Sequence, residues 1–532
     1  MRNAPALSLA ALLLSTGIAQ ADYTLHILHI NDFHSRIEPI SKFDSTCTTE
    51  DDAAGKCFGG VARLAAKINE LRDGITQAGG NVIVLDAGDQ SQGSLMYTQY
   101  KGAAEAGFMA MIGFDAMAVG NHEFDNGPEG LAVFLDKADT PIISGNLDVS
   151  QSNLLNGRLQ KHVVLDVGGQ KIGIVSALAT DTPETSSPGP TVIFKDDIDS
   201  LKAEVAELQS QGVNKIIALE HLGYVRDQKI AAEVPGLDAV VGGHSHTYLS
   251  SNDPDAAGPY PTKVKGPDGA DVPVVQAYAY SKYLGHLELT FDDAGNLISA
   301  KGEPILLDAS VKPDPTYAAK VADLAKPLEE VRAKVVAEAA APIDGQRETC
   351  RQQECQMGNL VAEAMLDRVK DQGVTIAIQN GGGVRASIDA GPITMGEILT
   401  VLPFQNTLST FETTGATIVA ALENGVSQVE EGAGRFPQVA GLKYSFDPAK
   451  PVGSRVSDVL VESDGSWGAI DPGKTYLAVT NNYVRTGGDG FAMFKDAPNA
   501  YDFGPDLADV TADYLAAHLP YTPALDGRIT RK

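Results

Sequence analysis

Short apolar runs alternate with amphipathic segments over the first 310 residues of the chain. The apolar runs are each followed by polar or glycine-rich positions, which is typical of strands buried on both faces. They lie at residues 24–30, 81–87, 114–119, 171–178, 215–221 and 237–243. Between them, residues 61–74 and 199–212 have the pattern of helices, and Gly212 ends the second as glycine commonly ends a helix. This alternation predicts a layered α/β domain.

A segment rich in Ala, Glu, Lys and Val separates this region from the rest of the chain. It spans residues 313–340 and predicts a linker helix that is interrupted or kinked near Pro327. We therefore expect a first domain at residues 22–312 and a second α/β domain, with mixed strands and glycine-rich loops, at residues 341–532. A chain of 532 residues is long enough for two domains.

The N-terminal residues have the features of a secretory signal peptide. Arg2 supplies a positive charge, residues 5–14 are apolar, and residues 19–21 read Ala-Gln-Ala, which matches a cleavage site. The apolar run is too short for a membrane span. We expect a signal peptide at residues 1–21 and a mature protein that begins near Asp22, has no membrane anchor and works in the periplasm or outside the cell.

The four cysteines form two pairs that are close in sequence, Cys47 with Cys57 and Cys350 with Cys355. Four cysteines allow three pairings, and nearness along the chain favours the two local ones. Disulfides also suit an oxidising compartment. A zinc site made by the thiolates is the alternative.

The charge of the chain is strongly acidic, with 41 basic and 69 acidic residues and a net charge of −28. This balance argues against nucleic acid or an anionic membrane as a partner. An anionic substrate would need a local concentration of positive charge, and bound metal ions supply that in a compact form.

Polar residues that bind metals follow five of the expected strands. These residues are Asp32, His34, Asp89, Asn121, His122, His221, His244 and His246. Two pairs, Asp32 with His34 and His244 with His246, are spaced two residues apart, which on an extended backbone directs both side chains to one side. Because sites in layered α/β domains lie at the carboxyl ends of strands, we expect these side chains to meet. One histidine after a strand is usually structural, but five such blocks together predict a metal site.

The donor types at these positions suit two divalent cations: carboxylates, imidazoles, one amide and no thiolate. Two such ions with a bridging carboxylate bind a phosphate ester, and a metal-bound hydroxide attacks the phosphorus. The metals also offset the charge that develops during the reaction. The sequence thus predicts a phosphoester hydrolase and leaves Zn, Mn and Co open as the metals.

The order of these blocks resembles the calcineurin-like metallophosphoesterase superfamily and, within it, the 5′-nucleotidase family, which includes periplasmic UDP-sugar hydrolases and ecto-5′-nucleotidases. The resemblance implies an α/β/β/α first domain. It implies one metal held by Asp32, His34 and His246, a second held by Asn121, His221 and His244, and Asp89 as the bridge. It also implies that His122 is the catalytic histidine and that Asp125 orients it and stabilises its charged form, which helps a poor alkoxide leaving group depart. Glu123 is expected only to complement a helix N-terminus.

Four stretches of the second domain resemble the C-terminal domain of the same family: CRQQECQMGNL, IQNGGGVRASI, TVLPFQN and NNYVRTGGDGF. The resemblance implies that Arg351 and Arg385 contact the phosphate. It implies that Asn380 contacts the base or ribose, that Asp489 contacts the ribose hydroxyls, and that Gly382 lies in a loop that approaches the ligand. It also implies that Phe404 and Tyr483 lie on either side of the base. Aromatic faces stack any base, and a carboxylate accepts both hydrogen bonds of a vicinal diol. Ordinary core packing is the alternative for the two aromatic residues.

The resulting hypothesis is a secreted two-metal 5′-nucleotidase that hydrolyses nucleoside 5′-monophosphates, with UDP-sugars or other nucleotides as further substrates. The alternatives are a 2′,3′-cyclic-nucleotide phosphodiesterase with 3′-nucleotidase activity, an NAD pyrophosphatase, a thiosulfate-ester hydrolase and a catalytically inactive nucleotide-binding protein. The stretches NGGGVR and GGDG favour the first hypothesis. We expect a monomer or homodimer whose site lies between the domains, with the linker as a hinge.

Overall fold

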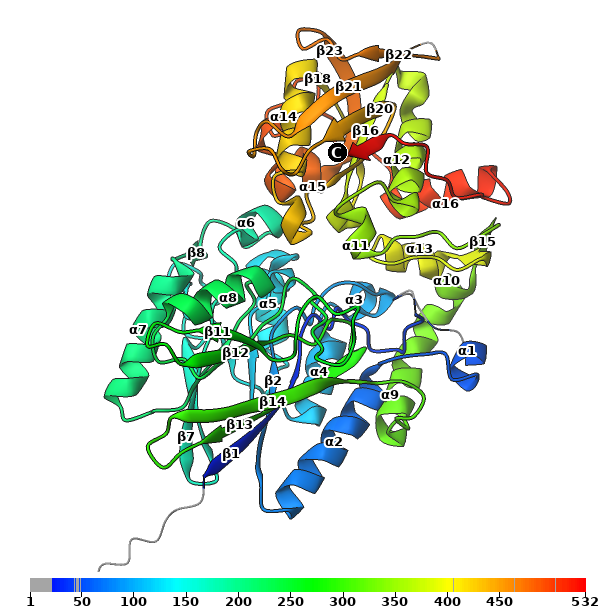
Figure 1. The fold of residues 1–532 in the computed structure, drawn as a ribbon. Coiled ribbons are helices and arrows are strands. Elements are labelled where there is room, and N and C mark those ends of the chain that lie inside the picture. The colour runs from blue at the N-terminus through cyan, green and yellow to red at the C-terminus, as the bar shows by residue number, and fades with distance from the viewer. Residues whose placement is uncertain are drawn as a thin grey trace, which may run out of the picture.

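The computed structural model describes residues 22–42, 44, 47, 49–404, 406–463, 465–502 and 504–532. The expected signal peptide at residues 1–21 lies outside these residues. Within the described ranges, no helix has both the length and the apolar composition needed to cross a bilayer. Figure 1 shows the chain folded into two bodies joined by the segment that contains α9 (Pro315–Ala325).

Two six-stranded sheets pack face to face in the N-terminal domain (Figure 1). Their strands are β1 (Tyr23–Ile30), β2 (Asn81–Asp86), β3 (Ala116–Ala118), β4 (Ile142–Ile143), β6 (His162–Val167), β7 (Gln170–Val175), β9 (Ile216–Leu219), β10 (Ala239–Val241), β11 (Thr262–Lys265), β12 (Asp271–Val275), β13 (Tyr283–Phe291) and β14 (Leu297–Leu306). The first sheet has the order β14-β13-β1-β2-β3-β4 and the second β11-β12-β10-β9-β7-β6. Strands β1 to β4 are parallel, as are β7, β9, β10 and β12. A separate pair joins β5 (Leu147–Asp148) to β8 (Ile193–Phe194).

Helices cover the outer face of each sheet. The first sheet packs against α2 (Val61–Gln77), α4 (Ala103–Ile112) and α9, and the second against α7 (Asp197–Ser210) and α8 (Tyr224–Glu233). Shorter elements at the strand ends are α1 (Thr49–Ala53), α3 (Leu95–Tyr100), η1 (His122–Phe124), α5 (Gly127–Leu135) and α6 (Thr182–Thr185). The predicted α/β/β/α layering is confirmed.

Alternation along the strands explains why both faces of each sheet are apolar. In β1, Leu28 faces the helices while Ile27 faces the other sheet. In β9, Ile217 faces the first sheet and Ala218 the helices. Successive side chains of a strand point to opposite faces, so a strand covered on both sides reads as a continuous apolar run. The six predicted strands all form, although β3 and β10 are each only three residues long.

The linker expected at residues 313–340 is only partly helical. Helix α9 is followed by the 3₁₀ turn η2 (Lys326–Leu328), which contains Pro327, and by α10 (Glu329–Ala333). The prediction of helix up to residue 340 is wrong, because β15 (Val335–Ala339) pairs antiparallel with β17 (Gly391–Thr394) of the second domain. Two β-branched valines begin this strand, and pairing buries its small side chains.

The C-terminal domain holds two four-stranded sheets, with the orders β18-β23-β16-β19 and β22-β21-β20-β24. The strands are β16 (Ile376–Asn380), β18 (Leu408–Thr414), β19 (Pro437–Ala440), β20 (Leu442–Phe446), β21 (Val456–Ser463), β22 (Ser466–Ala469), β23 (Thr475–Asn481) and β24 (Ile529–Arg531). The helices are α11 (Arg347–Cys350), α12 (Gln356–Val369), α13 (Met395–Val401), α14 (Gly415–Gly425), α15 (Asn482–Arg485) and α16 (Leu507–Ala517), with 3₁₀ turns η3 (Lys370–Gln372), η4 (Gly381–Gly383), η5 (Val429–Glu431), η6 (Gly488–Gly490) and η7 (Ala492–Phe494). Strands β16 and β23 are parallel neighbours, so Asn380 and Asn481 end side by side.

Both cysteine pairs form the local disulfides favoured by the sequence. Cys47 is bonded to Cys57, and Cys350 to Cys355. The second disulfide joins the end of α11 to the N-cap of α12. It therefore fixes the short segment that carries Arg351.

The packing between the two sheets predicts how much stability is lost when a side chain buried between them is truncated. Ile217→Ala should lower the free energy of unfolding of the N-terminal domain by about 2–5 kcal/mol, because Ile217 is fully buried between the sheets and its loss leaves a cavity. Denaturant unfolding measures the change. The matched substitution Ile298→Ala, at a side chain 54% exposed on β14, should change little. Equal effects of the two substitutions would contradict the inter-sheet packing.

Candidate metal centre and substrate cavity

The loops that leave the carboxyl ends of five strands meet at one edge of the N-terminal domain. Asp32 and His34 follow β1, Asp89 follows β2, and Asn121 follows β3. His221 follows β9, and His244 and His246 follow β10. All of these side chains are buried except that of His244, which is partly buried. The structure therefore brings together every metal ligand predicted from the sequence.

The backbone at these residues is not extended, so the predicted reason for the two-residue spacing is wrong. Asp32, His34, Asp89, His244 and His246 all have positive φ angles, between 49° and 72°. Main-chain hydrogen bonds between loops hold this conformation: the N–H of Asp32 donates to the carbonyl of Gly88 and that of His34 to the carbonyl of Asp89, both at 2.9 Å. Left-handed backbone at non-glycine residues persists where surrounding contacts fix it, and it clusters at functional sites.

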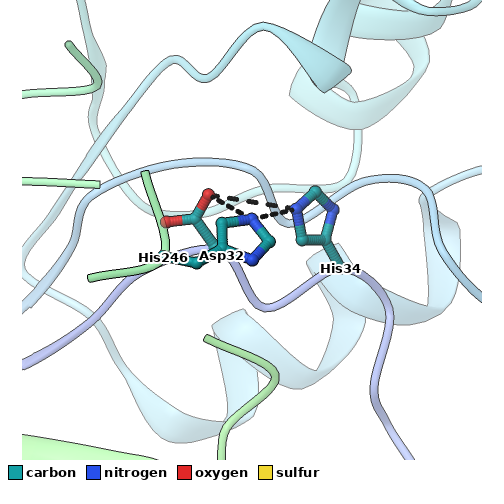
Figure 2. A group of neighbouring side chains, drawn as sticks. All are labelled: Asp32, His34 and His246. Carbon is teal, nitrogen blue, oxygen red and sulfur yellow. Dashed lines mark hydrogen bonds and ion pairs between the residues drawn. The ribbon is translucent and has the colours of Figure 1, made fainter. Parts of the chain in front are cut away.

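The first group of ligands consists of Asp32, His34 and His246 (Figure 2). Nε2 of His246 lies 3.1 Å from Oδ1 of Asp32 and 3.0 Å from Nε2 of His34. The ligand atoms of the three residues all lie within 4.8 Å of one another. A divalent cation among these atoms would take up lone pairs that otherwise face each other.

The second group is arranged around Asp89. Its Oδ2 lies 3.1 Å from Nε2 of His221 and 3.7 Å from Nε2 of His34. Nearby, Nδ1 of His244 lies 2.9 Å from Oδ1 of Asn121. Asp89 thus approaches histidines of both groups, as a bridging carboxylate would.

The hydrogen bonds of the histidines fit metal binding. Nδ1 of His221 donates to the carbonyl of Ala87 at 2.7 Å, and Nδ1 of His34 to the carbonyl of Ser91 at 3.2 Å. Each ring therefore directs its Nε2 into the site, which is how histidine ligands are held. Nε2 of His221 and Oδ1 of Asp32 are buried, and within the part of the chain that the structure describes each faces another expected ligand, Asp89 and His246 respectively. The residues present fit two divalent cations.

The electrostatics of the site also call for positive charge. Burial lowers the pKa of His34, His244 and His246 well below its ordinary value, which keeps these rings in the neutral form that binds metals. Burial acts in the same direction on His221, but the neighbouring Asp89 carboxylate outweighs it and raises the pKa of His221 to about 10. The buried carboxylates thus draw positive charge toward the position between them.

Glu123 has a different place from the one predicted. It is 2% exposed and lies in η1, and its carboxylate accepts hydrogen bonds from three main-chain N–H groups. Oε2 accepts from Gly120 at 2.8 Å and from Asp89 at 3.1 Å, and Oε1 accepts from Ser91 at 3.0 Å. Glu123 therefore joins the loops after β2 and β3, and the prediction that it only complements a helix N-terminus is wrong. Its position inside a metal-binding block was the available signal.

His122 and Asp125 form a close pair beside the metal ligands. Nδ1 of His122 lies 2.6 Å from Oδ2 of Asp125, whose Oδ1 accepts from the hydroxyl of Ser186 at 2.7 Å. Burial lowers the pKa of His122, but Asp125 and then Asp89 outweigh it, so the pKa is raised. Nε2 is left as the ring nitrogen for proton transfer. No motif in the sequence pointed to Ser186.

A cavity of about 930 Å³ lies between the two domains and joins this site to the second domain. From the first domain it is lined by Asp89, Asn121, His122, His244 and His246. From the second it is lined by every residue predicted there: Arg351, Asn380, Gly382, Arg385, Phe404, Tyr483 and Asp489. Residues far apart in the sequence thus share one cavity of a size suited to a small-molecule ligand.

Five arginines line this cavity: Arg226, Arg347, Arg351, Arg385 and Arg435. Among the described residues, Arg347, Arg351 and Arg385 have no carboxylate within ion-pair distance. Arg385 donates to Nε2 of His34 at 3.0 Å and Arg347 to the carbonyl of His244 at 3.3 Å. Burial, reinforced by the guanidinium groups of Arg347 and Arg385, holds the pKa of Arg351 well below its usual range. A multiply charged anion such as phosphate would relieve this repulsion.

Arg347 was not predicted from the sequence. It lies in α11, one helical turn before Arg351, and this spacing was the signal that could have identified it.

The two aromatic residues predicted to hold a base both line the cavity, which favours that role over core packing alone. The ring of Phe404 stacks on that of His122, with centroids 5.8 Å apart, and the Arg385 guanidinium lies 5.5 Å from the Phe404 centroid. Tyr483 packs against the core of the second domain and is hydrogen-bonded to Asp489.

Comparison with known proteins gives the same two domains. Residues 25–248 match the family model described as calcineurin-like phosphoesterase, and residues 334–496 that described as 5′-nucleotidase, C-terminal domain. A 5′-nucleotidase of Diplobatis ommata is 42% identical, covering 96% of this chain and 90% of that protein. A 5′-nucleotidase of Homo sapiens is 40% identical, covering 99% and 94%. The crystal structure of a 5′-nucleotidase precursor from Thermus thermophilus aligns with a TM-score of 0.90 at 43% identity, covering 96% of this chain and 99% of that one.

The hydrogen bonds of Glu123 to the ligand loops predict that the affinity of the site for metal ions depends on this residue. Glu123→Ala should weaken binding of Zn²⁺ or Mn²⁺ by about 10- to 100-fold, because three buried N–H groups of the ligand loops lose their acceptor. Titration of the metal-free protein measures the affinity. Glu129→Ala, at an exposed glutamate of α5, is the control and should leave it unchanged. Unaltered metal affinity in the Glu123 variant would show that these loops hold their shape without it.

Proposed function

The chain belongs to the 5′-nucleotidase family of metal-dependent phosphoester hydrolases, and on that basis we propose that it hydrolyses nucleoside 5′-monophosphates to a nucleoside and inorganic phosphate. One observation carries the proposal: a single cavity is lined by four of the predicted metal ligands (Asp89, Asn121, His244 and His246), by arginines that include Arg347, Arg351 and Arg385, and by the residues expected to bind a nucleoside. A site that binds only phosphate would not need the residues expected to bind a nucleoside.

The metal ligands fall into two sets in this proposal. Asp32, His34 and His246 would hold one divalent ion and Asn121, His221 and His244 the other, with the Asp89 carboxylate between the two sets. When bound, two such ions supply Lewis-acid chemistry at the phosphoryl group. Zn, Mn and Co all suit these nitrogen and oxygen donors.

The chain's own side chains bind the phosphate and transfer the proton. Arg351 and Arg385 hold the phosphate, and Arg347 adds a third positive group to the same wall. His122 donates its Nε2 proton to the departing 5′-oxygen of the ribose. Asp125 keeps the imidazole in the required orientation through Nδ1 and stabilises its protonated form. An alkoxide is a poor leaving group, so this proton lowers the barrier to its departure.

The nucleoside lies against the second domain. Phe404 and Tyr483 contact the base, Asn380 contacts the base or ribose, and Asp489 accepts hydrogen bonds from the ribose hydroxyls. Gly382 belongs to η4, where the absence of a side chain lets the backbone approach the ligand. The cavity volume leaves room for UDP-sugars as further substrates.

The domain boundaries and the compartment are part of the proposal. We assign residues 22–312 to the phosphoesterase domain and residues 341–532 to the nucleotide-binding domain, with β15 added to the latter because it pairs with β17. Two disulfides support a location in the periplasm or outside the cell.

Removing and restoring the metals tests the proposed reaction. Protein treated with a chelator should release no phosphate from AMP, and addition of Zn²⁺, Mn²⁺ or Co²⁺ should restore release, because the buried ligand set is completed only by cations. A panel of AMP, UDP-glucose, NAD and 2′,3′-cyclic AMP identifies the substrate class. Preference for NAD or the cyclic nucleotide would overturn the proposed substrate while keeping the metal chemistry, and no turnover with any metal would favour a binding protein.

Substitution of His122 tests the proton transfer. His122→Ala should lower kcat for AMP by about 10²- to 10⁴-fold, with metal content unchanged. The loss should be much smaller for an aryl phosphate, whose phenolate departs without a proton. His518→Ala, at an exposed histidine after α16, is the control for kinetics and metal content. Equal losses on both substrates would show that His122 acts in some way other than as the acid.

A further inference from the structure

Asp489 is held in an unusual setting for a loop carboxylate. It lies in η6 between glycines, its φ is 53°, and it is 6% exposed. Its main-chain carbonyl accepts from Nδ2 of Asn424 at 3.1 Å. Its carboxylate accepts hydrogen bonds from the side chains of Asn380 and Tyr483.

The hydroxyl of Tyr483 makes two hydrogen bonds to Asp489. It donates to Oδ1 at 3.2 Å and accepts from the main-chain N–H at 3.1 Å. The hydroxyl oxygen of Tyr483 therefore links the carboxylate of Asp489 to the main-chain N–H of the same residue. Burial, together with the Asp489 charge, raises the pKa of Tyr483 well above its ordinary value, so the phenol keeps the proton that it donates.

The tyrosine ring and the asparagine are themselves fixed. The ring lies so close to Gly488 that a Cβ at that residue would overlap it. Asn380 donates from Nδ2 to Oδ2 of Asp489 at 2.6 Å, while its Oδ1 accepts from Nδ2 of Asn481 at 2.9 Å. Both partners of the carboxylate are thus held in place before any ligand binds.

We propose that the hydroxyl of Tyr483 is a positioning group that orients Asp489 for the vicinal hydroxyls of a ribose. This inference rests on the proposed function, in which Asp489 contacts the ribose. A carboxylate offers about four acceptor positions, and Asn380 and Tyr483 occupy two of them, which leaves two for the 2′- and 3′-hydroxyls. Orienting the acceptor in advance removes an ordering cost from binding.

The substitution Tyr483→Phe separates this role from stacking on the base, because the aromatic ring is kept and only the hydroxyl is lost. Tyr483→Phe should raise KM for AMP by about three- to tenfold, the range expected for one hydrogen bond, and change kcat by less than about twofold. KM for 2′,3′-dideoxy-AMP, which has neither hydroxyl, should stay the same in the variant and the wild type.

Two further variants make the comparison specific. Tyr476→Phe removes a tyrosine hydroxyl in β23 that accepts from the N–H of Asp471 at 3.0 Å and does not line the cavity. It should leave KM and kcat unchanged for both substrates. In an Asp489→Ala background, adding Tyr483→Phe should change KM for AMP by less than about twofold, since the group it positions is gone.

Calorimetric binding of adenosine and 2′,3′-dideoxyadenosine measures the same preference without turnover. The wild type should bind adenosine more tightly, and Tyr483→Phe should reduce that preference. Absence of AMP hydrolysis by the wild type would overturn the proposed function, whereas this binding comparison would still decide the role of Tyr483. An unchanged preference in the variant, or an equal rise in KM for the dideoxy substrate, would overturn the inference.

Discussion

One cluster of buried carboxylates and imidazoles constrains the rest of this structure, and its ligand atoms lie close together at the carboxyl ends of the strands. Nε2 of His221 faces Asp89, Nε2 of His246 faces both His34 and Asp32, and all of them are buried. Desolvated carboxylates in such an arrangement are unfavourable unless positive charge lies among them, either as a metal ion or as the proton that Asp89 holds on His221. The layered fold tolerates the arrangement because main-chain hydrogen bonds and Glu123 hold the loops in place.

The second domain contributes a group of three arginines to the cavity that this acidic and imidazole-rich edge also lines. Arg347, Arg351 and Arg385 line the shared cavity although the whole chain has a net charge of −28. Their mutual repulsion is relieved by an anion that reaches both domains, as a phosphate does. In the proposed function, the same anion would present its leaving group to His122. The distribution of charge between the domains would then link substrate binding to catalysis.

Particular residues show why some predictions from the sequence were wrong. The spacing of Asp32 and His34 predicted convergence correctly, but through an extended backbone that the structure does not have. Glu123 looked like a helix-end charge because its three N–H partners come from loops up to 34 residues away. Val335–Ala339 continued a helical composition but pairs with β17, more than 50 residues later. In each case the deciding contact is distant in sequence.

The sequence by itself determined the layered α/β architecture of the first domain, the two local disulfides, and the residue types at the strand ends. It could do so because strand and helix periodicity, cysteine nearness and donor chemistry are local properties of the chain. Only the tertiary structure decided that Arg347 joins the other arginines, that Ser186 supports Asp125, and that Tyr483 holds Asp489. These depend on hydrogen bonds and burial between elements that composition and spacing do not encode.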